Sequence, residues 1–260
     1  MITNVSSLIR SKELIWTWTE RIVQARYQQS ILGGLWMIVQ PVATVAIFTV
    51  IFTFFVPVNT GKIPYVVFSY TALIPWLLFA NGLTDMANAV VDNMSLVTKI
   101  YFPREVLPFA VLLSRVLDFF IASVLLIVLI LYFKVPIYPV GWLYLPIILA
   151  IQMAQIVGFG LALAAANVFY RDVKPLLTLG LQLWFYASPI IYPVSMVPER
   201  FRPFYFLNPM AGVLEAYRAV LLYKTLPGAY LWTSGLVALV IVVAGYWFFK
   251  RVEFQFADII

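Results

Sequence analysis

Long runs of apolar side chains constrain this chain more than any other feature, because about 20 such residues are enough to cross a bilayer as a helix. The runs show no alternation of period two, which favours helices over membrane strands. The chain is 63% hydrophobic and only 11% charged, whereas soluble domains have about 25% charged residues. The sequence therefore predicts an all-α integral membrane protein with six transmembrane helices, at about residues 35–56, 65–83, 112–133, 142–168, 176–197 and 231–249.

Basic residues are divided unevenly between the segments that join these runs. If the N-terminus is cytoplasmic, the two short outer loops hold one lysine each, Lys62 and Lys134, and most other basic residues fall on the cytoplasmic side. The positive-inside rule requires this distribution, and the longer outer segment before the last run belongs to a kind that translocates with less regard to charge. We therefore expect both termini in the cytoplasm. The net charge of +6 is an orientation signal rather than a nucleic-acid-binding patch.

Residues 1–33 carry an amphipathic pattern. Polar residues recur every three or four positions, and a mostly apolar set recurs at the same intervals two positions away, so the two sets lie on opposite sides of a helix. The segment also holds two tryptophans and four basic residues. It predicts a helix that lies in the headgroup plane of the membrane. The alternative is a soluble amphipathic helix packed on a partner.

A charged, proline-bounded stretch, Asp92–Pro108, separates the second and third runs. It carries Lys99, Arg104 and Glu105, whereas the runs on either side are almost purely apolar. We interpret it as a short amphipathic helix on the cytoplasmic side, where a soluble partner could reach it and pass force into the membrane. The alternative is an ordinary connecting loop.

Arg115 and Asp118 lie within the third run. If the membrane begins near Leu112, Arg115 is about one helical turn inside the bilayer, where it can reach the headgroups or pair with Asp118 three positions along. The alternative is an ion-coupling pair of the kind found inside gradient-driven transporters.

Two features predict close packing among the runs. Pro75 interrupts the middle of the second run, and a proline there is tolerated in lipid when neighbouring helices enclose it. The fourth run contains Gly158 and Gly160, which permit another helix to approach closely.

The last third of the chain is irregular. The run at 176–197 is broken by Pro189 and Pro193, and a later apolar stretch, Met210–Tyr223, has only 14 residues and carries Glu215 and Arg218. A stretch of this length favours a re-entrant or interfacial segment over a crossing. We expect re-entrant helices over about residues 190–223.

The sequence excludes several kinds of chemistry. It contains no cysteine and no histidine, which excludes disulfides, thiol or imidazole catalysis and an ordinary zinc site. It lacks a GxxxxGK[ST] phosphate-binding loop, so we expect no cofactor in this chain and no catalytic activity of its own. Ionisable residues are scarce within the runs, which disfavours a transporter powered by an ion gradient. Energy for uphill transport would then enter through the cytoplasmic segments from another subunit, and six spans favour an oligomer.

Aromatic side chains are frequent within and at the ends of the runs. They are typical of the aromatic belts at membrane surfaces. The alternative is a pathway lined with rings that stack on sugars without charge. The candidates for such a pathway are Trp36, Tyr65, Trp76, Phe79, Trp184, Tyr186 and Tyr192.

Four motifs occur in a fixed order: ARYQQSILGGLWMIVQP (25–41), LVTKIYFPREVLP (96–108), FYRDVKP (169–175), and SPIIYP (188–193) followed by FLNPM (206–210). With the hydropathy pattern, they resemble the membrane subunit of type-2 ABC exporters of the polysaccharide class, which includes the O-antigen, lipopolysaccharide and teichoic-acid export permeases. The resemblance covers about residues 8–258. It implies ATP-driven export of a lipid-linked polysaccharide across the bacterial inner membrane.

The resemblance also implies partners and an internal organisation. Such permeases are homodimers that dock on two copies of an ATP-binding subunit, which holds the ATP and Mg²⁺. Residues 1–33 would form the interfacial helix beside that subunit, 34–250 the transmembrane domain and 251–260 a cytoplasmic tail. The pathway would lie between protomers and be lined by aromatic residues. A coupling helix would span Ser95–Glu105, with Tyr101 and Phe102 as apolar anchors. Its interface residues would be Ser95, Leu96, Lys99, Ile100, Tyr101, Phe102, Pro103, Arg104 and Glu105.

Three rival functions follow from the same sequence. An exporter of the same architecture could carry a drug or small lipid, and a gradient-driven transporter would use Arg115 and Asp118. A membrane-embedded glycosyl-transfer enzyme would need a carboxylate near a polar cavity, for which Asp85 and Asp118 are weak candidates.

Overall fold

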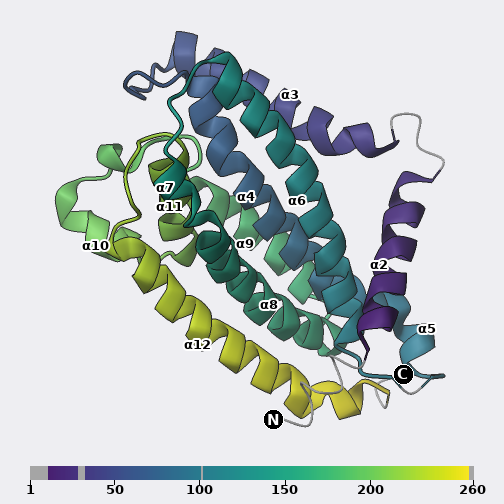
Figure 1. Cartoon of the computed structure of the whole chain (residues 1–260). Coiled ribbons are helices and arrows are strands. Elements are labelled where there is room, and N and C mark those ends of the chain that lie inside the picture. The colour runs from purple at the N-terminus through teal and green to yellow at the C-terminus, as the bar shows by residue number, and fades with distance from the viewer. Residues whose placement is uncertain (1–10, 29–32, 101, 258–260) are drawn as a thin grey trace.

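The computed structural model describes residues 11–28, 33–100 and 102–257, and within them every regular element is helical (Figure 1). Residues 1–10 and 29–32 of the expected interfacial segment and residues 258–260 of the expected tail lie outside the described residues. The longer helices are α2 (Lys12–Tyr27), α3 (Trp36–Val50), α4 (Tyr65–Ala89), α6 (Val106–Tyr132), α8 (Leu145–Phe169), α9 (Val173–Tyr186), α11 (Pro209–Leu221) and α12 (Ala229–Val252). Short elements join them: η1 (Gly33–Leu35), η2 (Ile51–Phe55), η3 (Val91–Asn93), α5 (Met94–Val97), α7 (Pro139–Trp142), η4 (Val194–Met196), η5 (Glu199–Phe201), α10 (Arg202–Tyr205) and η6 (Glu253–Ala257).

Five helical segments of the described chain are long and apolar enough to cross a membrane. They are Gly33–Phe55, Tyr65–Val97, Val106–Tyr132, Pro139–Phe169 and Ala229–Phe256. They coincide with five of the six predicted runs, and the all-helical prediction is confirmed.

The sixth predicted run differs from the expectation. Residues 176–197 contain most of α9, which has 14 residues and ends at Tyr186, so its length of about 21 Å falls short of a hydrocarbon core of about 30 Å. Pro189 and Pro193 account for the break, because proline lacks an N–H donor and disfavours helical backbone in the residue before it.

Helix α4 lies at the centre of the bundle, between α3, α6, α8 and α11 (Figure 1). Of its most apolar stretch 78% is buried, compared with 11% for the segment that contains α3. The prediction that Pro75 marks an enclosed helix is therefore confirmed. The buried Gln152 side chain of α8 donates to the Pro75 carbonyl at 2.7 Å and accepts from the Tyr217 hydroxyl of α11 at 3.1 Å, which joins three helices without leaving a polar group unpaired.

Helices α8 and α12 approach each other at glycines, as Gly158 predicted. A Cβ atom at Gly158 would lie 2.6 Å from the backbone of Ile241, and one at Gly245 would meet the Gly158 carbonyl. Gly160 instead makes room for the Met86 side chain of α4. Small residues at such contacts let two backbones pack directly, which supplies dispersion contacts that larger side chains would prevent.

One end of the bundle gathers segments that are distant in sequence. The end of α12 meets the start of α6, where Lys250 pairs with Glu105 at 3.0 Å, and it meets the end of α8, where the rings of Phe256 and Phe169 lie 6.0 Å apart. We call this the basal end; α5 lies there too (Figure 1). Both charged turns of the sequence, Asp92–Pro108 and Phe169–Pro175, therefore lie at the same end.

Candidate functional site

The coupling segment, residues 95–105, lies at the basal end after α4. Of the helix expected over Ser95–Glu105, the structure forms only α5, which ends at Val97. The remaining described residues of the segment, from Thr98 to Glu105, form turns and irregular backbone. Pro103 explains part of this difference, since it disfavours a helical conformation at Phe102. Tyr101, an expected anchor, lies outside the described residues.

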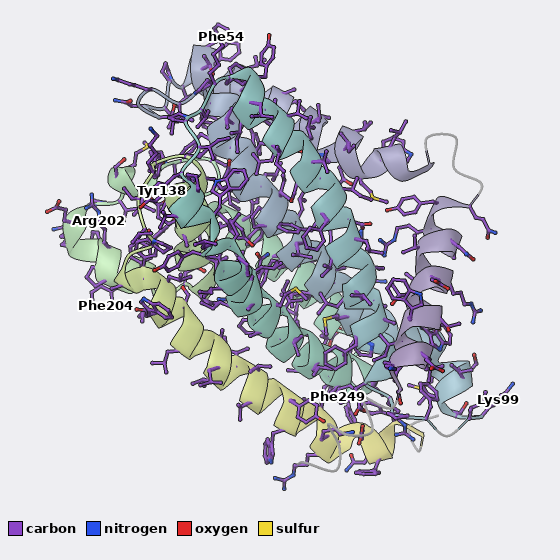
Figure 2. All side chains as sticks on the ribbon, viewed as in Figure 1. Phe54, Lys99, Tyr138, Arg202, Phe204 and Phe249 are labelled. Carbon is purple, nitrogen blue, oxygen red and sulfur yellow. The ribbon has the colours of Figure 1, made fainter. Side chains whose placement is uncertain are left out.

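Exposure divides the expected interface residues into groups. Ser95, Lys99 and Ile100 are exposed, and Figure 2 shows Lys99 projecting outward beside α5. Phe102 packs against the hydrophobic core, whereas 56% of the Ile100 surface is exposed. Of these two apolar side chains, Ile100 is the more exposed, and the role of Phe102 as an anchor stays a prediction. The half-buried members are Leu96, Phe102, Pro103 and Arg104.

Glu105, one of the expected interface residues, is enclosed rather than exposed. Its side chain is fully buried, and the Lys250 ammonium donates to both of its carboxylate oxygens at 3.0 Å. A buried carboxylate needs such a counter-charge, because burial of an unpaired charge is very costly. Glu105 thus holds the coupling segment to α12.

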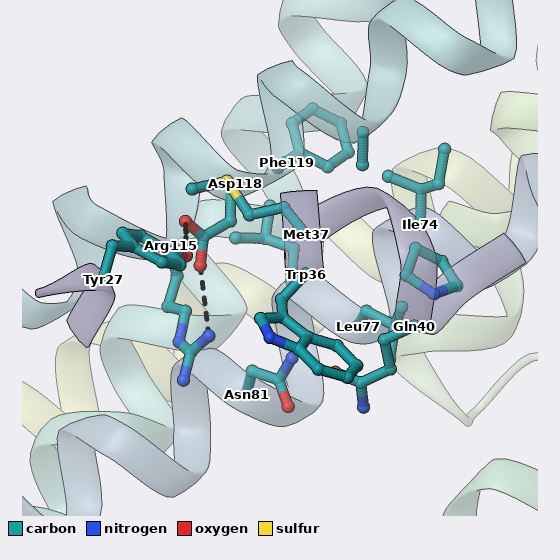
Figure 3. A pocket seen from close by; sticks show the side chains of 13 residues that line it. Tyr27, Trp36, Met37, Gln40, Ile74, Leu77, Asn81, Arg115, Asp118 and Phe119 are labelled. Atoms are coloured by element: carbon teal, nitrogen blue, oxygen red, sulfur yellow. Dashed lines mark hydrogen bonds and ion pairs between the residues drawn. The ribbon is translucent and has the colours of Figure 1, made fainter. Parts of the chain in front are cut away.

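Four charged side chains from three helices form a cluster between α2, α4 and α6. Arg115 donates to Asp85 at 2.6 Å and to Asp118 at 3.1 Å, so the predicted pair with Asp118 is confirmed (Figure 3). Arg26 of α2 donates to Asp118 at 2.7 Å and to Asp85 at 3.3 Å. Two cations and two anions compensate each other, which disfavours the ion-coupling alternative.

Tyr27 extends this four-charge cluster. Its hydroxyl donates to Asp118 at 3.1 Å, and burial, followed by the Asp118 carboxylate, raises the pKa of the Tyr27 phenol. The phenol therefore stays protonated and remains a donor. Thr19, earlier on α2, donates to the Ala110 carbonyl of α6 at 3.2 Å. Two sets of polar contacts therefore fix α2 to the third apolar run.

A polar cavity of about 100 Å³ adjoins the four-charge cluster. The Trp36 indole and the Gln40 and Asn81 amides line it beside Arg115 and Asp118, and Figure 3 shows these side chains around one space. The cavity lies where α2 gives way to α3. Met37, Leu77 and Phe119 also line it, so this small cavity can contact both a hydroxyl group and an apolar C–H face of a ligand.

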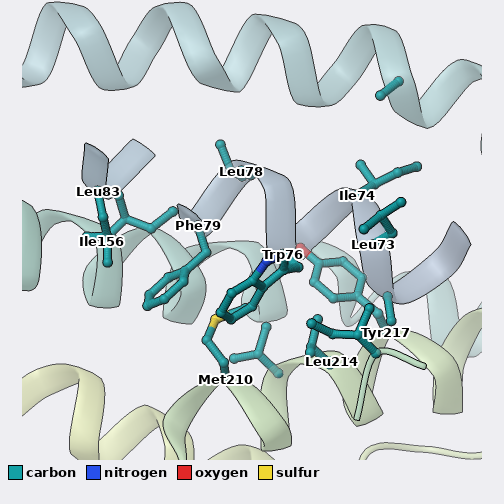
Figure 4. Close-up of a cluster of buried hydrophobic side chains, with 14 of the residues drawn as sticks. Leu73, Ile74, Trp76, Leu78, Phe79, Leu83, Ile156, Met210, Leu214 and Tyr217 are labelled. Atoms are coloured by element: carbon teal, nitrogen blue, oxygen red, sulfur yellow. The ribbon is translucent and has the colours of Figure 1, made fainter. Parts of the chain in front are cut away.

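The aromatic candidates are divided between the core and the surface. Trp76 and Phe79 are buried on α4, with ring centroids 5.7 Å apart, and Phe79 lies 5.0 Å from Trp184 of α9. Figure 4 shows Trp76 and Phe79 beside the Met210 and Leu214 side chains of α11. Trp76 and Phe79 are therefore enclosed within the helix bundle and do not lie at its surface.

The remaining candidates lie nearer the surface or in a polar network. Trp36 and Tyr186 are exposed by 50% and 61%. Tyr65 is buried and donates to the Ile191 carbonyl at 2.8 Å, while the Tyr192 hydroxyl lies 3.1 Å from that of Tyr205. Only Trp36 and Tyr186 therefore present a ring to the outside.

The two parts of the fourth motif, SPIIYP and FLNPM, meet in the fold. Asn208 of the FLNPM motif accepts from the Trp184 indole at 2.8 Å and from the Met210 amide at 3.1 Å, so it caps α11 and joins it to α9. Arg218 of α11 is fully buried and donates to the Ile190 carbonyl at 2.9 Å, which fixes the SPIIYP segment. These contacts pair backbone groups near the two prolines, which allows the prolines to interrupt an apolar run in lipid.

Sequence reasoning missed Arg26 and Lys250 as structural partners and gave Asp85 only a weak catalytic candidacy. The available signal was charge sign: Asp85 stands alone just beyond the second run, and an isolated charge beside a spanning segment needs a partner. Within the described residues no group of acidic side chains is placed to hold a metal ion. Both Asp85 and Asp118 are paired with arginines, which disfavours the glycosyl-transfer alternative.

The similarity to known proteins extends over most of the chain and is not confined to one site. Residues 13–222 match the ABC-2 type transporter family. The chain is 30% identical over 262 aligned residues, which cover 99% of both chains, to the O-antigen export system permease protein RfbA of Myxococcus xanthus. It is 29% identical to the protein of the same description in Klebsiella pneumoniae, with 93% of each chain covered. It is 24% identical to the polysialic acid transport protein KpsM of Escherichia coli over 76% of this chain and 77% of that protein.

Proposed function

The chain belongs to the ABC-2 type transporter family, and from this premise we propose that it is the membrane permease of an exporter that moves a lipid-linked polysaccharide across the bacterial inner membrane. The observation that carries the proposal is the similarity over 99% of both chains to an O-antigen export permease. The polysialic acid transport protein supports the same cargo class. Five long apolar helices supply the membrane domain.

ATP hydrolysis by a separate subunit would supply the energy. The sequence has no phosphate-binding loop of its own. We propose a homodimer that docks on two ATP-binding subunits through the exposed part of the coupling segment, where Ile100 enters an apolar groove and Lys99 contacts the rim. Hot spots of this kind pair one apolar anchor with surrounding polar contacts.

The topology completes this proposal. We propose that α9 and the residues after it make the sixth crossing, and that α10 and α11 form the re-entrant region near the outer surface. All but one residue of the 13-residue α11 are buried, as expected for a half-membrane helix enclosed by spans. The basal end would then face the cytoplasm with both termini.

The glycan pathway would use the exposed faces of α3 and α9 rather than the buried rings of α4. Trp36 stands at the start of α3 and Tyr186 at the end of α9. The polar cavity lined by Trp36, Gln40 and Asn81 would contact a sugar of the cargo at the level of the inner headgroups. Ring stacking on sugar C–H surfaces and amide hydrogen bonds supply recognition without charge.

Surface polysaccharide in cells that lack the chromosomal permease tests both the function and this cavity. Wild-type protein is expected to restore polysaccharide at the surface, and Trp36→Ala to reduce it roughly three- to tenfold, because an aromatic contact contributes about 1 kcal/mol. Trp232→Ala is the matched control, since Trp232 is similarly exposed but lies on α12. The cavity proposal is wrong if both variants behave alike at equal membrane levels. Restoration of drug or small-lipid export without polysaccharide would favour the rival cargo.

A further inference from the structure

We propose that the end of α12 and η6 form a clamp that carries movement of the coupling segment into the last span. The C-terminal clamp consists of Arg104, Glu105, Lys250, Glu253 and Phe256. The inference rests on the proposed function and assigns residues that transmit motion within the permease without touching ATP or cargo.

The ionic part of the clamp joins residues that are far apart in the chain. Lys250 Nζ lies 3.0 Å from both oxygens of Glu105, 145 positions earlier, and 2.9 Å from Glu253. Glu105 is completely buried, and Glu253 is 8% exposed. One lysine is therefore shared by two carboxylates at the junction between the coupling segment, α6 and α12.

The aromatic part joins the second cytoplasmic turn to the same point. Phe256 is fully buried, with its ring 5.6 Å from that of Phe249 and 6.0 Å from that of Phe169, which opens the FYRDVKP motif. The Arg104 guanidinium carbon lies 5.8 Å from the Phe256 ring centroid, within the range of a cation–π contact. Phe256 therefore contacts both charged turns that face a cytoplasmic partner.

This arrangement makes the junction stiff. The buried Glu105 carboxylate cannot separate from Lys250 without leaving its own charge unpaired in a low-dielectric site. Ile100 and Lys99 are only a few residues from Glu105, so a push on them reaches Lys250 over a short length of chain. From α12 the displacement passes to α8 through the direct backbone contact at Gly158 and Gly245, because close-packed helices transmit strain.

Polysaccharide exported per ATP hydrolysed tests the clamp in the complex with the ATP-binding subunit. Glu105→Gln and Lys250→Gln are each expected to lower this ratio about tenfold, a typical coupling between two sites, while ATP hydrolysis stays within about twofold. Combining both changes with Glu253→Gln should recover part of the ratio, because no carboxylate or ammonium of the ionic part is then left unpaired. Arg251→Gln, an exposed neighbour of Lys250, should not change it.

Two outcomes of this test would overturn the clamp. One is a wild-type ratio in the single variants, and the other is a parallel loss of export and hydrolysis, which would place these residues in docking. If the single variants do not assemble, Phe256→Leu replaces them, and an assembled complex with an unchanged ratio would contradict the proposal.

A distance measurement keeps the clamp separate from the identity of the cargo. The chain has no cysteine, so Thr98→Cys and Gln255→Cys, both at exposed positions, can carry spin labels in the full complex. The clamp predicts that ATP leaves their distance unchanged in the wild-type background and changes it in Glu105→Gln. An ATP-dependent change in the wild-type background would contradict it. Absence of surface polysaccharide with wild-type protein would instead contradict the proposed function.

Discussion

Gly158→Ala is expected to lower the stability of the permease by roughly 1–3 kcal/mol, and Gly158→Val by more, because overpacking of a close-packed contact has this cost. The added Cβ atom would lie 2.6 Å from the backbone of Ile241. Backbone atoms cannot turn aside as a flexible side chain can, so α8 and α12 must separate along the contact that includes Gly245. The loss should appear as a lower unfolding temperature of the detergent-purified protein and a smaller amount in the membrane.

Gly180→Ala is the matched control for this prediction. Gly180 also lies within a helix, but a Cβ atom there meets nothing within 4 Å, so alanine should be neutral or stabilise α9 by up to about 1 kcal/mol through its higher helix propensity. Equal shifts in the two variants would show that the direct contact of α8 with α12 does not hold in the protein.

Asp118→Asn is expected to cause the second large effect, since Asp118 accepts from Arg26 at 2.7 Å, Arg115 at 3.1 Å and Tyr27 at 3.1 Å. Removal of its charge leaves two arginines facing the single carboxylate of Asp85. Breaking a fully buried pair costs about 3–5 kcal/mol. The side chains here are 17–27% exposed, so screening by solvent lowers the expectation to roughly 1–3 kcal/mol.

A double-mutant cycle separates this cluster from ordinary surface charge. Arg26→Gln combined with Asp118→Asn should cost less than the sum of the two single changes, because the double variant restores charge balance. Glu199→Gln serves as the control: Glu199 is 89% exposed in its pair with Arg202, and its loss should leave the unfolding temperature unchanged. Additive effects in the cycle would contradict a coupled four-charge cluster.

The parts of the fold that depend on local composition could be predicted from the sequence. Run length identified five spanning helices, and spacing along one helix identified the pair of Arg115 with Asp118. Gly158 predicted a close helix contact because a missing side chain has the same consequence whichever partner approaches. The run at 176–197 was harder, since its average composition is apolar and the effect of Pro189 and Pro193 depends on where Asn208 and Arg218 find partners.

The candidate site depended on contacts that the sequence does not order. Glu105 reads as an exposed charge in a polar segment, and its burial follows from Lys250, 145 positions away. Trp76 and Phe79 read as pathway residues because composition does not distinguish a ring in the core from one on the surface. Their exposure was decided by the positions of α9 and α11 around α4.

Export of a polysaccharide driven by ATP is tested by measuring ATP hydrolysis by the purified permease, alone and with its ATP-binding subunit, in the presence and absence of lipid-linked polysaccharide. We expect the two proteins to purify as a complex, hydrolysis to occur only in that complex, and the polysaccharide to stimulate it. Ile100→Glu should prevent complex formation. Ile137→Glu should not, because Ile137 is also exposed but follows the other end of α6. A permease that binds no ATP-binding subunit, or a complex whose hydrolysis is indifferent to the polysaccharide, would contradict the account.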